Sequence, residues 1–245
     1  MKILVCITHV PDTTSKISFI EQNTKFDQNG VQFIIGPYDD YALARAVELK
    51  EQLGGTITAL NVGTSETEPT IRKALAIGAD DAIRIDAEPT DAFFVANQIA
   101  HIARTNAYDL ILMGRESIDF NGGQVHGMVG ALLGMPSISP VMTLDIDGNI
   151  AKISREIEGG KELLEVALPF VAGCQEPIAE WKIPNMRGIM SARSKPLVIV
   201  APFSDLVRTT VNHFELPPAK SGIKMIDAEH IGELVDLLRN EAKVL

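Results

Sequence analysis

Short apolar runs alternate with longer amphipathic stretches along the first half of the chain. Residues 2–8 form a nearly unbroken apolar run, and similar runs recur at 56–62, 81–85 and 108–113. Short runs of this kind are typical of strands that are buried on both faces. Strands that alternate with helices predict an α/β fold with a doubly wound, mostly parallel sheet that helices cover on both sides.

The stretches between these runs carry apolar residues at helical spacing. Asp39 and Asp40 are placed to cap the first helix, and Thr64 or Ser65 is placed to cap the second. A third helix is expected to begin at Thr90, and a fourth, which is rich in small residues, ends near residue 133. This part of the chain is therefore predicted to contain four helices.

The pattern changes after residue 137. β-prone runs at 143–147, 150–157 and 163–168 are separated by the turn residues Asp147-Gly148 and 158–160. Turn residues between such runs predict antiparallel hairpins. We therefore expect an antiparallel β meander over residues 141–173.

The last part of the chain is expected to leave the compact body. One more strand is predicted at 197–201, and the compact part is expected to end near Pro202. A final helix places Ile231, Leu234, Val235 and Leu238 on one face. We expect an α/β domain over residues 1–202 and an extended C-terminal arm over residues 203–245 that packs on a partner.

Charge and composition narrow the possible functions. The 245 residues include 22 Lys and Arg against 32 Asp and Glu, a net charge of −10, which argues against a nucleic-acid partner. Cys6 and Cys174 form no CxxC pair, and the five histidines lack the spacing of a metal hydrolase. We therefore predict neither a disulfide framework nor a metal site.

The sequence shows no targeting signal. The apolar run after Lys2 is too short for the core of a signal peptide. No stretch approaches the roughly 18 apolar residues that a membrane span requires. We expect a cytoplasmic protein, although a trimmed organellar chain would look the same.

Candidate chemistry lies at the predicted strand ends, because ligands of parallel sheets bind beyond the carboxyl ends of the strands. Loops at 8–14, 62–65 and 114–125 follow such ends, and the third, here called the Gly-rich loop, is the richest in glycine and polar residues. Backbone N–H groups of residues 122–124 at a helix start can hold a phosphate. A tight turn without a ligand remains an alternative reading.

Several well-known signatures are missing. The chain has no GxxxxGK[ST] motif, and no GxGxxG follows the first strand. Gly114-Arg-Glu-Ser117 lacks the second glycine of a nucleophile elbow. A P-loop enzyme, an ordinary dinucleotide site and an α/β-hydrolase are therefore excluded.

A basic segment stands out within this acidic chain. Residues 181–204 carry Lys182, Arg187, Arg193 and Lys195 and no acidic residue. They also include Met186 and Met190. A solvated positive face is one reading of this composition. The other is a docking loop, because methionines adapt to partner surfaces and basic groups attract acidic partners.

Motifs along the whole chain resemble the β subunit of the electron transfer flavoproteins. They are KILVCI at 2–7, ALARAVELK at 42–50, IRKALAIGAD at 71–80, DLILMGR at 109–115, SID at 117–119, REIEGG at 155–160 and GIM at 188–190. The resemblance implies a heterodimer with a homologous α subunit, which holds most of one FAD. It also implies that the pair takes electrons from acyl-CoA dehydrogenases and passes them to a quinone oxidoreductase at the membrane.

The same resemblance assigns roles to parts of this chain. The β subunit is expected to bind AMP, to catalyse no bond chemistry and to pack its C-terminal arm on the α subunit. Tyr38 matches an aromatic residue that approaches the flavin ring, and Met186 matches an anchor residue in the docking segment, residues 182–195. The expected nucleotide-binding residues are Cys6, Gly36, Pro37, Tyr38, Asp39, Val62, Gly114, Arg115, Ser117, Asp119, Asn121, Gly122, Gly123, Gln124 and Val125. The expected docking residues are Lys182, Met186, Arg187, Ile189 and Met190.

Two alternatives stay open beside this interpretation, and departures from the family pattern favour the first of them. AMP-binding members hold the phosphate with Asn, Gln and Thr, whereas Gly123, Gln124 and Val125 stand at these positions here. Arg115 and the Gln124-Val125 pair instead resemble electron-bifurcating members, in which a second FAD replaces AMP and oxidises NADH. A stand-alone nucleotide-binding module of the stress-protein type, which needs no α chain, is the third reading.

Overall fold

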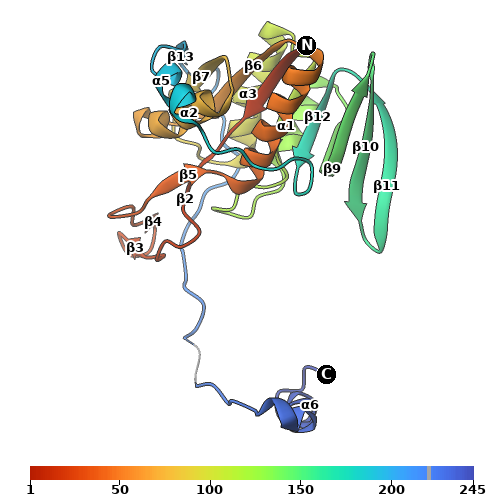
Figure 1. The fold of residues 1–245 in the computed structure, drawn as a ribbon. Coiled ribbons are helices and arrows are strands. Elements are labelled where there is room, and N and C mark those ends of the chain that lie inside the picture. Colours follow the sequence, from red (N-terminus) through yellow and green to blue (C-terminus); the bar gives the residue numbers. More distant parts are fainter. Residues whose placement is uncertain (220–221) are drawn as a thin grey trace.

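A nine-stranded sheet forms the centre of the computed structural model, which describes residues 1–219 and 222–245 (Figure 1). The parallel strands are, in order across the sheet, β9 (Ser137–Asp147), β12 (Phe170–Cys174), β8 (Leu110–Gly114), β1 (Lys2–Cys6), β6 (Thr56–Val62), β7 (Asp81–Ile85) and β13 (Leu197–Val200). Antiparallel β10 (Ile150–Ile157) and β11 (Gly160–Ala167) extend it beyond β9. The predicted mostly parallel sheet is confirmed.

Helices cover both faces of this sheet. On one face lie α1 (Pro37–Leu53), α2 (Glu68–Ile77) and α5 (Met186–Ala192), and on the other lie α3 (Ala92–Asn106) and α4 (Val125–Leu133). Alternate side chains of β1 separate accordingly, because Ile3 and Val5 pack with α1 and α2 whereas Leu4 and Cys6 pack with α3 and α4. This burial on both faces explains the continuous apolar runs, and the doubly wound arrangement is confirmed.

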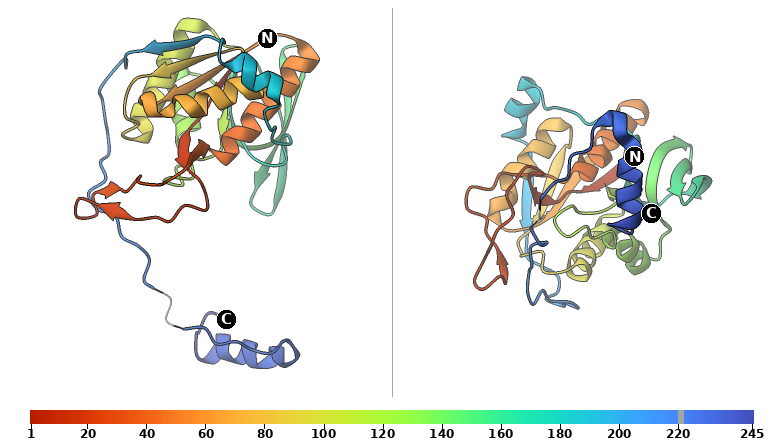
Figure 2. Two further views of the ribbon diagram at one scale, coloured as in Figure 1. Left: turned by 60° about the vertical axis from the view of Figure 1, so that its left-hand side comes forward. Right: turned by 90° about the horizontal axis from the view of Figure 1, so that it is seen from below.

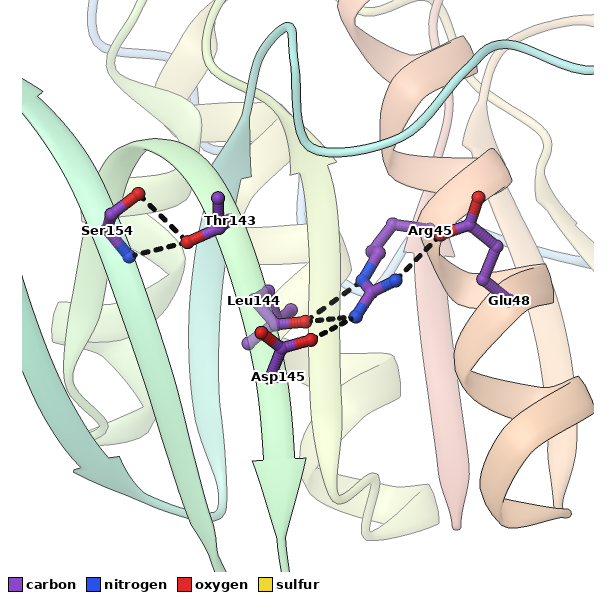
Figure 3. A network of polar contacts seen from close by, with 6 residues as sticks. All are labelled: Arg45, Glu48, Thr143, Leu144, Asp145 and Ser154. Atoms are coloured by element: carbon purple, nitrogen blue, oxygen red, sulfur yellow. Dashed lines mark hydrogen bonds and ion pairs between the residues drawn. The ribbon is translucent and has the colours of Figure 1, made fainter.

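The predicted meander consists of β9, β10 and β11, with β12 returning to the parallel part of the sheet. Arg45 of α1 joins the meander to the body, since its guanidinium donates to the backbone oxygen of Leu144 through Nε at 2.9 Å (Figure 3). The same side chain forms ion pairs with Glu48 at 2.7 Å and Asp145 at 2.9 Å. Arg45 is only 7% exposed, so this link is part of the core.

The expected helix starts are wrong in detail. Neither Thr64 nor Ser65 caps α2, which follows the short helix η1 (Ser65–Thr67) and has Thr67 as its N-cap with no side-chain cap. Helix α1 begins at Pro37 with Gly36 as its N-cap and no side-chain cap, so Asp39 and Asp40 lie within its first turn and do not cap it. Helix α3 begins after Asp91, whose side chain accepts from the Phe94 N–H at 2.6 Å. The helix itself starts at Ala92, so the prediction of Thr90 as the start is two residues early.

Two small ribbons occupy residues 9–36, for which the sequence predicted no regular element. Strand β2 (His9–Pro11) pairs with β5 (Phe33–Ile35), and β3 (Phe19–Ile20) pairs with β4 (Lys25–Phe26). Strands of two or three residues are too short to show a period, and the first pairing joins residues that are distant in sequence.

The C-terminal arm first follows the body and then leaves it. The ring of Phe203 stacks on His101 at 4.0 Å, and that of Phe214 stacks on Phe19 at 4.8 Å. The later elements, η2 (Ala228–His230) and α6 (Ile231–Asn240), lie away from the sheet, as Figure 1 and the left view of Figure 2 show. Residues 220 and 221 of the expected arm lie outside the described residues, and the boundary at residue 202 stays a prediction.

Candidate functional site

Asp39 connects three separate segments at the carboxyl edge of the central strands. Its Oδ2 accepts from the backbone N–H of Thr8 at 2.8 Å and from the Thr8 hydroxyl at 2.6 Å. Its Oδ1 accepts from the backbone N–H of Gly114 at 2.7 Å. The carboxylate thus fixes the chain just after β1 and the end of β8 to the first turn of α1. Several predicted site residues are brought together by these contacts.

Two glycines make this close approach possible. A Cβ at Gly36 would lie 2.4 Å from the Thr8 hydroxyl oxygen, and a Cβ at Gly114 would lie 2.7 Å from Asp39 Oδ1. Real Cβ atoms do not approach other heavy atoms so closely, so any larger residue at these positions would displace the Asp39 carboxylate. The glycines at 36 and 114 are therefore explained by packing around Asp39.

Burial governs the ionisation of this cluster. It raises the pKa of Asp39 from its usual 3.8 to about 6, while the hydrogen bonds from Thr8 and Gly114 oppose the rise. Burial also raises the pKa of the Cys6 thiol, and the nearby Asp39 adds to that effect. Cys6 is therefore an un-ionised thiol packed in the core, which suits a structural residue and not a nucleophile.

The Gly-rich loop turns back on itself before α4. Ser117 and Gly122 form an isolated bridge, and the Ser117 hydroxyl donates to Asp119 at 2.5 Å. A Cβ at Gly122 would meet nothing within 4 Å, and no side chain caps the first turn of α4 after Gln124. The prediction of anion donors at residues 122–124 is wrong for Gly122, because its N–H donates to the backbone oxygen of Ser117 at 3.2 Å. The N–H groups at the start of α4, which no side chain caps, are left to hold an anion, and the helix dipole favours one there.

A cation lies beside the aromatic ring at the start of α1. The guanidinium carbon of Arg115 lies 5.3 Å from the ring centroid of Tyr38. Arg115 donates to Gln175 Oε1 at 2.6 Å, and Gln175 in turn donates to Glu156 of β10 at 2.7 Å. Glu156 of the meander thus orients Arg115 through Gln175, with the Arg115 guanidinium beside the Tyr38 ring.

The end of β6 completes the edge. Asn61 donates through Nδ2 to the backbone oxygen of Ile7 at 2.9 Å, which ties β6 to the end of β1. The buried Arg84 donates to the backbone oxygen of Gly63 at 2.9 Å. Val62, the predicted site residue, lies between these two fixed points and is itself 8% exposed.

The predicted docking residues form a separate surface on the docking segment. They belong to α5 and the chain before it, and α5 packs on α2. Met186 is 73% exposed and Met190 is 69% exposed, and Trp181 and Ile183 nearby are also largely exposed. Such a group of large exposed apolar side chains is typical of a partner-binding surface. The structure does not bring these residues together with the Gly-rich loop.

Sequence reasoning missed three residues of the site. Thr8 lies in the loop 8–14 that follows the first predicted strand, but its bond to Asp39 joins positions that are 31 residues apart. Gln175 directly follows the buried strand β12, so its place at a strand end was a usable signal. Glu156 reaches the site only because β10 and β12 lie in one sheet.

Comparison with known proteins identifies the family. A family model described as the electron transfer flavoprotein domain matches residues 23–204. The electron transfer flavoprotein subunit beta of Bacillus subtilis (strain 168) is 36% identical over 261 residues, which cover all of both chains. The chain belongs to the electron transfer flavoprotein family, as a β subunit.

Other relatives of this β subunit span bacteria and eukaryotes. The mitochondrial subunit beta of Arabidopsis thaliana is 32% identical over 257 residues that cover both chains fully. The subunit beta of Homo sapiens is 30% identical over 242 residues, 94% of this chain and 95% of the relative. Family membership implies an α-subunit partner and flavin-linked electron transfer by a carrier protein. None of the helices in residues 1–219 and 222–245 has the length and apolar character to cross a membrane.

Proposed function

We propose that this β subunit forms a heterodimer in which it binds AMP, braces an FAD held mainly by the α subunit, and docks the electron donor. Acyl-CoA dehydrogenases would supply the electrons, and a quinone oxidoreductase at the membrane would receive them. Bound FAD supplies the electron-transfer chemistry. This chain contributes binding and orientation and no catalytic residue.

The open helix start after the Gly-rich loop carries the nucleotide part of the proposal. Gly123 is exposed, and the exposed Gln124 stands at the N-cap of α4 with its side chain not used as a cap. Arg115, which also pairs with Glu116 at 3.3 Å, places a guanidinium near the same edge of the sheet. Asp39 is 3% exposed and its oxygens accept from Thr8 and Gly114, so this proposal gives Asp39 a role in supporting the loop in place of the expected nucleotide contact. The donor set therefore fits a phosphate with a base packed near Cys6 and Val62.

Tyr38 supports the flavin-bracing part of the proposal. Its position in the first turn of α1 is fixed by its neighbour Asp39, and its ring is accompanied by the Arg115 guanidinium. A partly exposed aromatic ring with an adjacent cation suits a surface that faces a flavin of a partner subunit.

The C-terminal arm supports the heterodimer. Helix α6 lies away from the body and exposes Ile231 and Leu234 on its apolar face. A ten-residue helix with such a face gains stability chiefly by packing on another chain. We assign this face to the α subunit.

A second FAD in place of AMP is the alternative function. Arg115 is the observation that favours it, because a guanidinium on this loop can neutralise part of the charge of a diphosphate. In that case the chain would belong to an electron-bifurcating flavoprotein that oxidises NADH.

The test is to co-purify this chain with its α subunit, release the small molecules and count FAD and AMP per heterodimer. One FAD with one AMP supports the carrier, whereas two FADs without AMP establish the bifurcating alternative. A heterodimer with Gly123→Pro and Gln124→Ala should lose the nucleotide of the β site and keep the FAD held mainly by the α subunit. Proline removes a backbone donor at the β site, and alanine removes the side-chain donor. Full retention of the nucleotide in this variant would place the site elsewhere.

A further inference from the structure

Two basic side chains join the docking segment to helix α2 in a reciprocal manner. Arg72 of α2 donates through Nη1 to the backbone oxygens of Ala192 and Lys195, both at 2.8 Å. Lys195 donates through Nζ to the backbone oxygens of Leu75 at 2.8 Å and Ala79 at 2.6 Å. Each segment therefore supplies a basic side chain that donates hydrogen bonds to backbone oxygens of the other segment.

Two of the four accepting oxygens belong to the carboxyl ends of the two helices, and the other two lie two or three residues beyond those ends. Ala192 is the last residue of α5, and Leu75 lies in the last turn of α2, which ends at Ile77. Terminal carbonyls of a helix have no partner within the helix, and a cation near them also interacts favourably with the helix dipole. Arg72 and Lys195, here called the reciprocal capping pair, thus donate to free carbonyl oxygens at the ends of α5 and α2.

The other end of α5 is fixed as well. The side chain of Asn185 caps the helix by accepting from the Gly188 N–H at 2.8 Å. Gly188 lies directly on α2, since a Cβ there would lie 2.3 Å from the backbone oxygen of Ala76. The backbone of α5 is therefore held against α2 without an intervening side chain.

This anchoring determines what the docking helix shows to solvent. Ala192 is 3% exposed and packs in the core, whereas Met186 and Met190 face outward and are 73% and 69% exposed. A helix of only seven residues does not persist in water without tertiary contacts. The order of α5 in the free protein must come from its contacts with α2.

We infer that Arg72 and Lys195 are positioning residues for partner docking, which keep α5 folded before an electron donor arrives. The inference rests on the docking role proposed above for residues 182–195. A preformed docking helix spares the complex the entropic cost of ordering it at the moment of binding. The pair therefore affects how readily the donor is captured and not the electron-transfer step that follows.

The experiment uses the intact heterodimer with Lys195→Met, Lys195→Arg and Arg72→Met. Lys2→Met is the matched control, because Lys2 Nζ caps the last carbonyl of α3, that of Asn106, at 2.6 Å and lies outside the docking segment. Amide hydrogen exchange is followed over residues 186–195, and reduction of the flavin is followed with an acyl-CoA dehydrogenase and octanoyl-CoA. Reduction by dithionite reports the flavin without any docking.

Lys195→Met and Arg72→Met should raise exchange in residues 186–195 about tenfold, while exchange in the central strands stays unchanged. The KM for the flavoprotein should rise about fivefold with kcat within about twofold of the wild type. Lys195→Arg should restore much of both values, and Lys2→Met should change neither. Dithionite should reduce every variant as it reduces the wild type.

Two results would overturn the inference. Unchanged exchange in residues 186–195 would mean that the pair does not order α5. Increased exchange with an unchanged KM would mean that the order of α5 does not serve docking. A wild-type heterodimer that accepts no electrons from the dehydrogenase would instead contradict the proposed donor, while the exchange data would still decide whether the pair orders the helix.

Discussion

Asp39 and Gly114 lie 75 residues apart in sequence, yet the Asp39 carboxylate accepts the backbone N–H of Gly114 at 2.7 Å. The bond joins the start of α1 to the residue from which the Gly-rich loop departs. The second oxygen of the same carboxylate holds Thr8, so one side chain sets the relative position of three segments. Changes at this point are expected to affect stability and nucleotide binding together.

Replacing Gly114 tests the close approach to Asp39. In Gly114→Ala the new methyl group would meet Asp39 Oδ1 and the Cβ of Tyr38 at 2.7 Å, so one of them must move. We expect the free energy of unfolding to fall by about 1–3 kcal/mol, as overpacking does, and β nucleotide content to fall with it. Gly122→Ala in the same loop is the control, because its methyl group meets nothing within 4 Å. Equal urea midpoints for the two variants would contradict the explanation.

The ionisation of Asp39 predicts a pH dependence. The folded protein binds this proton more tightly than the unfolded chain, because burial raises the pKa from 3.8 to about 6. The contribution of Asp39 to stability is therefore most favourable below pH 3.8 and declines as the pH rises through about 6, by about 3 kcal/mol in total. Asp39→Asn removes this pH dependence. It also lowers the unfolding free energy by an amount that does not change with pH, because one carboxylate oxygen that accepts a hydrogen bond is lost.

The comparison is made by urea unfolding of wild type and Asp39→Asn at several pH values between about 4 and 8. The unfolding free energy of the wild type should fall relative to that of Asp39→Asn as the pH rises toward about 6. A difference that stays constant over this range would mean that the Asp39 pKa is not raised.

Arg45 predicts a purely structural effect. Arg45→Met removes the bonds to the Leu144 oxygen and leaves that carbonyl without its donor (Figure 3). We expect a loss of about 2–3 kcal/mol in unfolding free energy, with FAD and AMP content unchanged. Lys152→Met is the control, since Lys152 forms only an exposed pair with Asp147 at 3.8 Å. Loss of the nucleotide at full stability would show that Arg45 acts on the site.

Met186 predicts a loss confined to docking. Met186→Ala should raise the KM of the heterodimer for reduction by an acyl-CoA dehydrogenase about tenfold, because an anchor side chain fills a pocket of the partner. Flavin and AMP content should stay at wild-type values. Met225→Ala truncates a methionine of the arm, outside the docking segment and 85% exposed in this chain alone, and should leave the KM unchanged. Wild-type kinetics for Met186→Ala would remove the docking assignment.

The sequence pattern predicted those strands and turns whose conformation is determined by neighbouring residues. The apolar runs gave the central strands, and Asp147-Gly148 gave the first turn of the meander. The role of Asp39 was not visible, because an aspartate before a helical pattern reads as a cap and only the tertiary structure shows that Thr8 and Gly114 use its oxygens. Gln175 was missed for the same reason, since its partner Glu156 lies 19 residues away. Lys195 was recognised as part of the basic segment, but its bond to Leu75, 120 residues away, was not predicted.

The position of α6 has a practical consequence for handling the protein. Its apolar face is presented to water at the end of an arm, where folding of the α/β body does not cover it. A preparation of this chain alone is therefore expected to self-associate as its concentration rises, by a route that leaves the sheet intact. Co-expression with the α subunit should then act as a solubility measure rather than as an aid to folding.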